Sequence, residues 1–287
     1  MKIAVTGGTG LVGRFVVEEA RAAGDDVMVL SRPDYSLGDR PALDGCDALI
    51  HCAFQHTPGR YRGGEADDPA GFTRANLDGS ITLFETAKAA GVARVIFLSS
   101  RAVYDGYAPG TELTEDLHPL PATLYGEVKW QAEQALAALN APGFSTASIR
   151  ATGIYGPGPG HKWSTLFADF LSGRVVSAER GTELLGTDLA SAVRVLLGST
   201  ASGAFNASDI LLDRHDLLTL VARLVPSPHM PPPPSEKPVS IMLCDRLRAL
   251  GWCQSGWDGL KNALPQMIKD IRLNEISWRC SVTGQRR

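Results

Sequence analysis

Two side chains four residues apart have the types needed for proton transfer. Tyr125 and Lys129 stand at positions i and i+4 of an expected helix, so both lie on one helix face. A free tyrosine has a pKa of about 10, and a nearby ammonium group lowers that pKa by favouring the phenolate. The pair therefore suits proton transfer to or from an alcohol or carbonyl oxygen. The alternative is a half-buried tyrosine covered by the aliphatic stem of a lysine.

A serine hydroxyl is expected beside this pair. The apolar run at 94–100 predicts a buried strand that ends in two serines, the second of which is Ser100. Ligands of open parallel sheets bind at the carboxyl ends of the strands, so this hydroxyl can reach a reacting oxygen. Arg101 follows and is a candidate for a substrate carboxylate or phosphate. It is equally well explained as a solvated arginine or as the partner of Asp105 or Glu115.

A glycine-rich turn supplies a candidate phosphate site near the start of the chain. Gly7, Gly10 and Gly13 have the spacing GxxGxxG, between an expected first strand and an amphipathic helix. Glycine is needed there for the sharp turn, for close approach to a pyrophosphate and for packing of the helix on the strand. A tight turn without a ligand would use the same residues. The position at the first strand–helix junction favours dinucleotide binding.

The end of the second expected strand bears on the choice of dinucleotide. An acidic residue at this point favours the free 2′-hydroxyl of NAD, whereas an arginine accommodates the 2′-phosphate of NADP. The chain reads Ser31-Arg32, with Asp34 close behind. Arg32 therefore favours NADP over NAD.

The elements around these residues alternate between short β-branched runs and longer amphipathic ones, which predicts an α/β fold with a doubly wound parallel sheet of the Rossmann type. The expected strands are 2–6, 27–31, 48–53, 94–100, 145–151 and 204–207. The expected helices of the core are 11–23, 71–90, 124–140 and 187–197. Residues 32–45 have little helical pattern, so a third strand–helix unit is expected to be reduced.

The alternation weakens after residue 156, which predicts a second, smaller lobe. We expect a dinucleotide-binding core at 1–153, to which 184–206 returns, and a substrate lobe made of 154–183 and 207–280. Residues 281–287 are expected to be a disordered tail.

Composition limits the possible functions. The 287 residues are 44% hydrophobic and 21% charged, which is ordinary for a globular protein with a sizeable core. A formal charge of −3 gives no basic surplus, which argues against nucleic-acid and anionic-membrane partners. No apolar stretch approaches the length of a membrane helix, and no signal peptide is apparent. Five cysteines without CxxC spacing predict buried thiols in a reducing cytoplasm, and the six histidines show no metal-binding pair.

Taken together, the motifs resemble those of the extended short-chain dehydrogenase/reductase family, which includes NAD-dependent epimerases and dehydratases. The matching motifs occur in family order over nearly the whole chain: the glycines of 7–13, His51-x-Ala53, Asn76, Ser99-Ser100-x-x-Val103-Tyr104, Tyr125-x-x-x-Lys129, Tyr155-Gly156-Pro157-Gly158, and the segments 186–190 and 247–252. The combination is far more specific than any one of its parts.

The resemblance implies roles for named residues. It makes Ser100 the catalytic serine, Tyr125 the acid/base and Lys129 both its activator and a ligand of the nicotinamide ribose. It places Gly7, Gly10, Leu11 and Val12 at the pyrophosphate and Ala53 at the ribose side of the cofactor. To these cofactor residues we add Thr9 and Gly13 of the same turn, and Arg32 from its position after the second expected strand. His161 and Trp163 are weaker substrate candidates, since the first is also explained as an exposed residue at a helix start and the second as part of the lobe's core. A homodimer through the helices at 71–90 and 124–140 is the usual assembly of the family.

Two departures from the family pattern concern the substrate. Many nucleotide-sugar enzymes of the family have an asparagine where this chain has Gly153, and an Arg-Asp-Phe type segment where it reads Glu183-Leu184-Leu185-Gly186. Both changes weaken the case for a nucleotide-diphosphate sugar. The leading hypothesis is an NAD(P)-dependent oxidoreductase that acts on a small sugar or sugar acid in the cytoplasm. A nucleotide-sugar epimerase or dehydratase and a non-catalytic NADP sensor are the alternatives.

Overall fold

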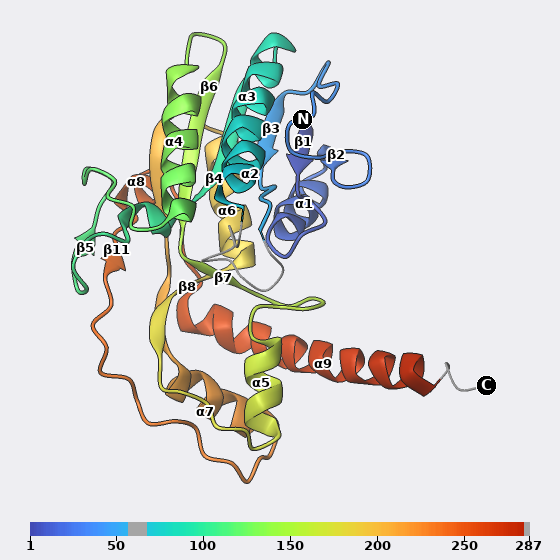
Figure 1. Ribbon diagram of the computed structural model, residues 1–287, viewed down its shortest axis with the longest axis vertical. Helices are drawn as coiled ribbons and strands as arrows, with labels where there is room; N and C mark the ends of the chain where they lie inside the picture. Colours follow the sequence, from blue (N-terminus) through green and yellow to red (C-terminus); the bar gives the residue numbers. More distant parts are fainter. Residues whose placement is uncertain (57–67, 284–287) are drawn as a thin grey trace. The chain divides into compact units, whose positions relative to one another are not determined.

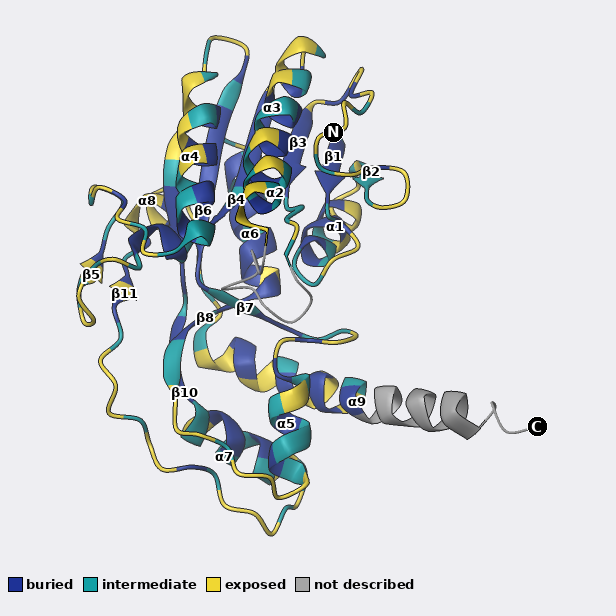
Figure 2. Cartoon of the chain, viewed as in Figure 1, coloured by how far each residue is buried: buried dark blue, intermediate teal, exposed yellow. Residues whose placement is uncertain are grey.

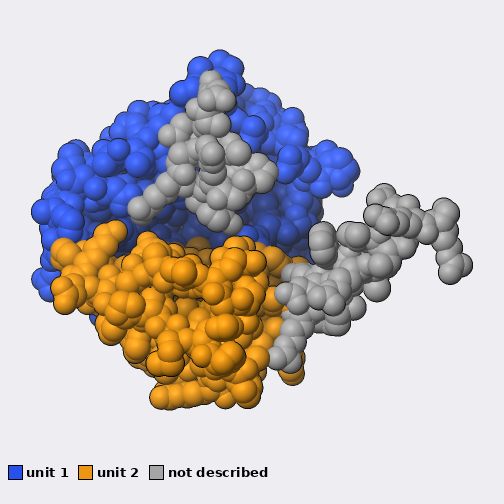
Figure 3. Space-filling model, turned by 60° about the horizontal axis from the view of Figure 1, so that its bottom comes forward, with its two compact units in different colours: residues 1–152, 187–208, 240–253 blue, residues 153–186, 209–239, 254–287 orange. Residues whose placement is uncertain are grey.

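The chain folds into two compact units, which Figure 3 shows in different colours. The computed structural model describes the backbone of residues 1–56 and 68–283, and the side chains as far as Ile271. The first unit consists of Met1–Thr152, Thr187–Ser208 and Ser240–Cys253. The second consists of Gly153–Gly186, Asp209–Val239 and Gln254–Arg287.

A parallel sheet of six strands, in the order β2-β1-β3-β4-β6-β9, forms the centre of the first unit (Figure 1). The strands are β1 (Lys2–Thr6), β2 (Asp26–Leu30), β3 (Ala48–His51), β4 (Arg94–Ser100), β6 (Ser145–Ala151) and β9 (Gly203–Ala207). All four residues of β3 are buried, as expected for a strand covered on both faces (Figure 2). The predicted Rossmann-type fold class is confirmed.

Helices cover both faces of this sheet. The elements are α1 (Gly13–Ala22), α2 (Pro69–Thr73), a π-helical turn (Arg74–Asp78), α3 (Gly79–Ala89), a 3-10 turn (Arg101–Tyr104), α4 (Leu124–Ala138), α6 (Gly186–Leu197) and α8 (Asp245–Ala249). Figure 1 shows α3 and α4 in front of the sheet and α6 behind it. On that second face α6 is joined to α1 by Arg194, whose Nε donates to the Glu19 carboxylate at 2.9 Å. Residues 31–47 contain no strand or helix, as their lack of periodicity predicts.

Residues 240–253 belong to the first unit, although the sequence pattern assigned them to the lobe. Two contacts explain the difference. The short strand β11 (Ile241–Met242) pairs with β5 (Glu112–Leu113). The buried indole N–H of Trp252 donates to the carbonyl oxygen of Asp188 at 2.9 Å. Neither contact leaves a periodic signal in the sequence.

The second unit combines a small sheet with three helices around an apolar core that includes Phe167 and Leu264. Its strands run in the order β10-β8-β7 and its elements are β7 (Gly153–Tyr155), α5 (Ser164–Leu171), β8 (Arg180–Leu185), β10 (Ile210–Asp213), α7 (Arg214–Leu224) and α9 (Gly256–Thr283). The three strands were not expected from the sequence. The expected tail at 281–287 overlaps the end of α9, and residues 284–287 lie outside the described residues. Within the described ranges no helix is both long and apolar enough to cross a membrane.

Candidate active site in the first unit

The glycine-rich turn forms a cradle without room for side chains. Gly7 has a φ of +66°, and a Cβ added to it would lie 2.8 Å from the Cα and N of Ala53. A Cβ on Gly13 would lie 2.8 Å from the carbonyl carbon of Gly7. The helix α1 begins beyond Val12, which makes no side-chain capping bond. The Arg14 and Phe15 amides are bonded to carbonyl oxygens of the same turn, so the close backbone of the glycines and the helix dipole are what this turn offers to an anionic group such as a pyrophosphate.

Two buried hydroxyls at the carboxyl edge of the sheet also fit a dinucleotide. Among the described residues, Ser31 Oγ and Thr152 Oγ1 have no hydrogen-bond partner, and they directly follow β2 and β6. Buried polar atoms are normally paired, so a bound ligand or water is expected at both. Arg32, next to Ser31, is exposed. The cradle and these hydroxyls together fit an NAD-type cofactor.

The start of α4 brings Tyr125 to the same edge as Ser100. Thr123 caps the helix, because its Oγ1 accepts a hydrogen bond from the Gly126 N–H at 3.1 Å. A Cβ on Gly126 would lie 2.5 Å from the carbonyl oxygen of Ala102, in the 3-10 turn that follows Ser100. Gly126 thus permits a close approach between the helix that carries the tyrosine and the turn that carries the serine.

Lys129, the lysine of the expected catalytic pair, is buried. Its side chain is 4% exposed, and its Nζ donates to the carbonyl oxygen of Leu98 at 2.7 Å. The Nζ also lies over the rings of Phe54 and Phe97, 4.4 and 4.7 Å from their centroids. Burial lowers the pKa of Lys129 to about 7, partly opposed by the negative charge of Glu133. The ammonium group can therefore exchange its proton near neutral pH.

The two adjacent serines have different partners. Ser99 Oγ donates a short hydrogen bond to Glu133, so this hydroxyl is committed to the interior. Ser100 Oγ accepts from the N–H of Ala102 at 3.2 Å. Accepting that bond leaves the hydroxyl hydrogen of Ser100 available to a reacting oxygen. The geometry supports Ser100, and not Ser99, as the serine of the site.

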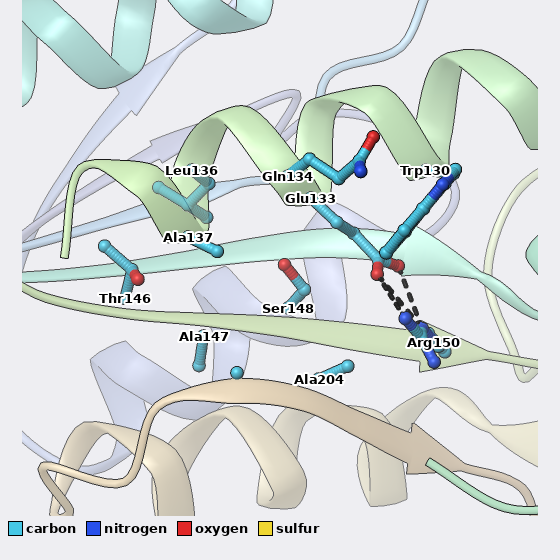
Figure 4. Close-up of a pocket in the computed structure, with 11 residues that line it drawn as sticks. Trp130, Glu133, Gln134, Leu136, Ala137, Thr146, Ala147, Ser148, Arg150 and Ala204 are labelled. Atoms are coloured by element: carbon cyan, nitrogen blue, oxygen red, sulfur yellow. Dashed lines mark hydrogen bonds and ion pairs between the residues drawn. The ribbon is translucent and has the colours of Figure 1, made fainter. Parts of the chain in front are cut away.

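A buried ion pair lies behind Ser99. The guanidinium of Arg150 binds the carboxylate of Glu133, with Nη2 and Oε2 2.7 Å apart, and both side chains are less than 5% exposed. The pair borders a cavity of about 250 Å³ between α4, β6 and β9, shown in Figure 4 with its dashed contacts. Ser100, Tyr125 and Lys129 do not line this cavity. The ion pair therefore supports α4 and β6 from behind the site.

A chain of buried hydrogen bonds runs from the cradle to the π-helical turn. The Ala53 N–H donates to Thr6 Oγ1 at 3.2 Å, and this hydroxyl lies 2.6 Å from His51 Nδ1. On the other side, His51 Nε2 lies 2.9 Å from Ser80 Oγ, which donates to the carbonyl oxygen of Asn76 at 2.5 Å. Because the Ser80 hydrogen is used, Nε2 is the donor and Nδ1 the acceptor. Burial, together with the charge of Lys129, lowers the pKa of His51 to about 3 and keeps the ring neutral.

Phe54 is a site residue that the motifs did not reveal. Its ring lies 5.1 Å from that of Tyr125 and nearly perpendicular to it, at 83°. It also forms one of the two faces that cover Lys129. The sequence shows only that an aromatic residue directly follows His51-x-Ala53. Its contact with Tyr125 depends on the fold, which brings this loop to α4.

The three weaker substrate candidates lie in different places. Arg101 makes an ion pair with Asp105 at 3.5 Å, one of the alternatives considered from the sequence. His161 and Trp163 are in the second unit and are only 3% and 6% exposed. His161 Nε2 lies 2.9 Å from the carbonyl oxygen of Met267, and Trp163 stacks on Tyr155 at 4.8 Å. Nothing in this geometry supports substrate contact by either, and their role stays a prediction.

Metal-ligating groups and free cysteines were also considered from the sequence. No group of three potential metal-ligating side chains occurs in the part of the chain that the structure describes. Cys46 and Cys244 are buried, whereas Cys253 is exposed, so the expectation of buried thiols does not hold for that residue.

Curated relatives match over about half of this chain. A ketoreductase of 4-hydroxy-2-methyl-3-oxo-4-farnesyl-3,4-dihydroquinoline-1-oxide from Stigmatella aurantiaca is 33% identical over 178 residues, which cover 54% of this chain and 51% of the relative. The decarboxylating sterol-4-alpha-carboxylate 3-dehydrogenase of Mus musculus is 33% identical over 175 residues, which cover 54% of this chain and 46% of the relative. The match therefore spans about half the length of these curated relatives.

Solved structures match over almost the whole chain. MoeE5 in complex with UDP-glucuronic acid and NAD has a TM-score of 0.79 at 22% identity, and the match covers 96% of this chain and 100% of that one. RMD from Pseudomonas aeruginosa complexed with NADPH has a TM-score of 0.78 at 23% identity, with 95% and 98% covered. These likenesses establish the fold. The model of the NAD dependent epimerase/dehydratase family matches residues 3–197, more than half of the chain, and the protein belongs to that family.

Proposed function

We propose that this protein is an NAD(P)-dependent oxidoreductase that transfers a hydride to or from an alcohol or carbonyl group of a small substrate. The observation that carries the proposal is the buried Lys129 ammonium, one helical turn from Tyr125 and in the same unit as the glycine cradle. Burying an ammonium group in an apolar interior is costly even with one carbonyl oxygen as its acceptor, so its retention beside a tyrosine favours a chemical role.

The residues of this chain would divide the work as follows. When bound, the nicotinamide cofactor supplies or accepts the hydride. Tyr125 Oη gives its proton to the carbonyl oxygen during reduction and takes it back during oxidation. The Lys129 ammonium would favour the phenolate form of Tyr125 and would bind the nicotinamide ribose, and the Ser100 hydroxyl would donate to the reacting oxygen. The cradle and Ala53 would hold the cofactor, and Arg32 would lie at its adenosine end.

The proposed substrate is a small polyhydroxylated molecule, a sugar or sugar acid. In the second unit, Gly153 packs against an ion pair between Lys162 and Glu183. A Cβ on Gly153 would lie 2.7 Å from Glu183 Oε2, so the pair takes the space that a larger side chain would need. An ammonium that donates and a carboxylate that accepts suit hydroxyl groups, and the carboxylate disfavours a diphosphate.

A nucleotide-sugar epimerase is the second candidate, and the fold of the UDP-sugar complexes favours it. A UDP-glucose 4-epimerase of Lacticaseibacillus casei is also 29% identical over 160 residues. An epimerase returns the hydride to the same substrate and keeps its cofactor, so protein purified without added dinucleotide would show cofactor absorbance. An oxidoreductase that exchanges its cofactor in each turnover would not. A non-catalytic NADP sensor is the third candidate and would not need the Tyr125–Lys129 pair.

The cofactor preference can be tested by calorimetric titration of cofactor-stripped protein with NADPH and with NADH. We expect tighter NADPH binding, and we expect Arg32→Ala to reduce that preference. Arg21→Ala, at another exposed arginine, is the matched control. Tighter NADH binding would contradict the role given to Arg32, and binding of neither would contradict the proposed function.

The catalytic assignment can be tested by Tyr125→Phe, with Tyr107→Phe as the control. The hydroxyl of Tyr107 bonds to the His118 carbonyl oxygen at 2.8 Å, away from the proposed site. With a panel of sugar and ketone substrates and NADPH, we expect Tyr125→Phe to lower kcat about 10²- to 10⁴-fold and to leave NADPH binding intact. Unchanged turnover would reject the proposal. A homodimer through α3 and α4 and a cytoplasmic location remain predictions.

A further inference from the structure

The catalytic lysine has an unusual set of neighbours. Two aromatic rings cover its ammonium group, Phe97 from β4 and Phe54 from the loop after β3. The carbonyl oxygen of Leu98 is its hydrogen-bond acceptor. Of the two rings, only that of Phe54 also contacts Tyr125 among the described contacts, at 5.1 Å. One side chain thus touches both members of the proposed catalytic pair.

The backbone on each side of Phe54 is fixed. The N–H of Ala53 donates to Thr6 Oγ1 at 3.2 Å. On the other side, the Gln55 N–H donates to Asn76 Oδ1 at 2.7 Å, and Asn76 Nδ2 donates to the Gln55 carbonyl oxygen at 2.8 Å. This two-bond clasp comes from the π-helical turn, a distortion that often occurs at functional sites.

The ring itself is also supported. Phe72 of α2 packs against Phe54 with centroids 5.5 Å apart and an interplanar angle of 72°. Phe54 is only partly buried, so its ring is not an ordinary core side chain. The hydrogen bonds on both sides of Phe54 and the contact with Phe72 fix this residue more firmly than is usual for a loop residue that is partly exposed.

We propose that Phe54 is a positioning residue of the active site, whose ring holds the Lys129 ammonium in place and fixes its orientation toward Tyr125. An aromatic face attracts a cation electrostatically, and the attraction is larger where water is excluded. A leucine at this position would fill similar space without that attraction. The inference rests on the proposed function only in taking Lys129 as the catalytic lysine.

The charge state of Lys129 offers a direct readout. The titratable groups that interact with it are His51 at the end of β3, Cys52 directly after it, and Glu133 of α4. Burial lowers the pKa of Lys129 to about 7 and raises that of the Cys52 thiol to about 12, so the thiol and His51 are neutral across the range in which Lys129 titrates. Loss of the Phe54 ring should lower the pKa of Lys129 further.

The experiment is a pH titration of the full chain labelled with ¹³C at lysine Cε, followed by NMR. Lys129→Met identifies the Lys129 resonance. In Phe54→Leu we expect the pKa of Lys129 to fall by about one unit, the size expected for a desolvated cation–aromatic contact. Phe54→Tyr keeps an aromatic face and should restore the wild-type value. If Phe54→Leu does not fold, Phe54→Met serves the same purpose.

The control is Phe72→Leu, which removes a ring that contacts Phe54 without a described contact to Lys129. A pKa that is unchanged or raised in Phe54→Leu would overturn the proposal. An equal fall in Phe72→Leu would also overturn it, because packing and not the Phe54 ring would then be responsible. The titration needs no substrate, so its result is separate from loss of the proposed function, which Tyr125→Phe tests.

Discussion

The buried His51 should make the stability of the first unit strongly dependent on pH. Its ring is fully buried and is hydrogen-bonded at both nitrogens, to Thr6 and Ser80. Protonation would put a hydrogen on Nδ1, where the ring now accepts a bond, and a charge in an apolar interior. The perturbation is a fall in pH from about 7.5 to about 5, compared between wild type and His51→Gln.

The magnitude follows from the two pKa values. Burial lowers the pKa of His51 from 6.5 to about 3 in the folded chain. Below pH 6.5 the unfolded chain binds one more proton at this site, so the free energy of unfolding falls as pH falls, and the loss continues to the folded pKa. At about 1.36 kcal/mol per pKa unit, His51 alone should cost about 2 kcal/mol between pH 7.5 and 5.

The assay is urea unfolding followed by circular dichroism and tryptophan fluorescence at each pH. Gln retains one donor and one acceptor but does not titrate, so His51→Gln should remove most of this pH dependence, whatever its stability at neutral pH. The control His118→Gln changes an exposed histidine and should keep the wild-type dependence. Equal pH dependence in wild type and His51→Gln would refute the reasoning.

Three further substitutions test other contacts. Gly126→Ala puts a methyl group 2.5 Å from the Ala102 carbonyl oxygen, and thermal melting should show a loss of about 1–3 kcal/mol; an unchanged melt would contradict the close approach. Arg150→Met leaves the Glu133 carboxylate buried without its cation and should cost about 3–5 kcal/mol in urea unfolding, most of it recovered when Glu133→Leu is added. Additive losses in that double variant would count against the ion pair. Gly13→Ala overlaps the preceding turn and should weaken NADPH binding by at least about tenfold in calorimetry, whereas binding at wild-type strength would remove the cradle from the site.

The strands of the main sheet were predictable because they are buried on both faces. β1 and β4 contain apolar runs, whereas β6 reads Ser-Thr-Ala-Ser-Ile-Arg-Ala, and all three strands have the bounds expected from the sequence. In the second sheet, β7 and β10 have only three and four residues, too few for a periodic pattern, and only the last two of the six residues of β8 are apolar. Residues 240–253 group with the first unit and not with the expected lobe for a similar reason, since a two-residue strand and one indole N–H connect this segment to the first unit.

Some residues of the candidate site could also be predicted from the sequence, and others could not. The glycine spacing and the i, i+4 pair are local in the chain, and both follow from the residues themselves. The role of Phe54 depends on Asn76 and Tyr125, which lie in separate elements, and that of His51 depends on Ser80, 29 residues away. Contacts at such separations have no sequence spacing of their own, so only the fold reveals them.

The division of the first unit into three chain segments has a consequence for synthesis on the ribosome. A nascent chain that has emerged as far as Thr152 contains five of the six strands but lacks β9, the edge next to β6. It also lacks the carbonyl oxygens of Leu196 and Ala201, to which the buried Arg94 guanidinium donates in the finished protein. The sheet is therefore completed only after residues 153–186 of the second unit have left the ribosome, and the first unit is completed only after residues 209–239 have followed. Co-translational folding of this chain must keep an incomplete dinucleotide-binding unit soluble until its last segment arrives.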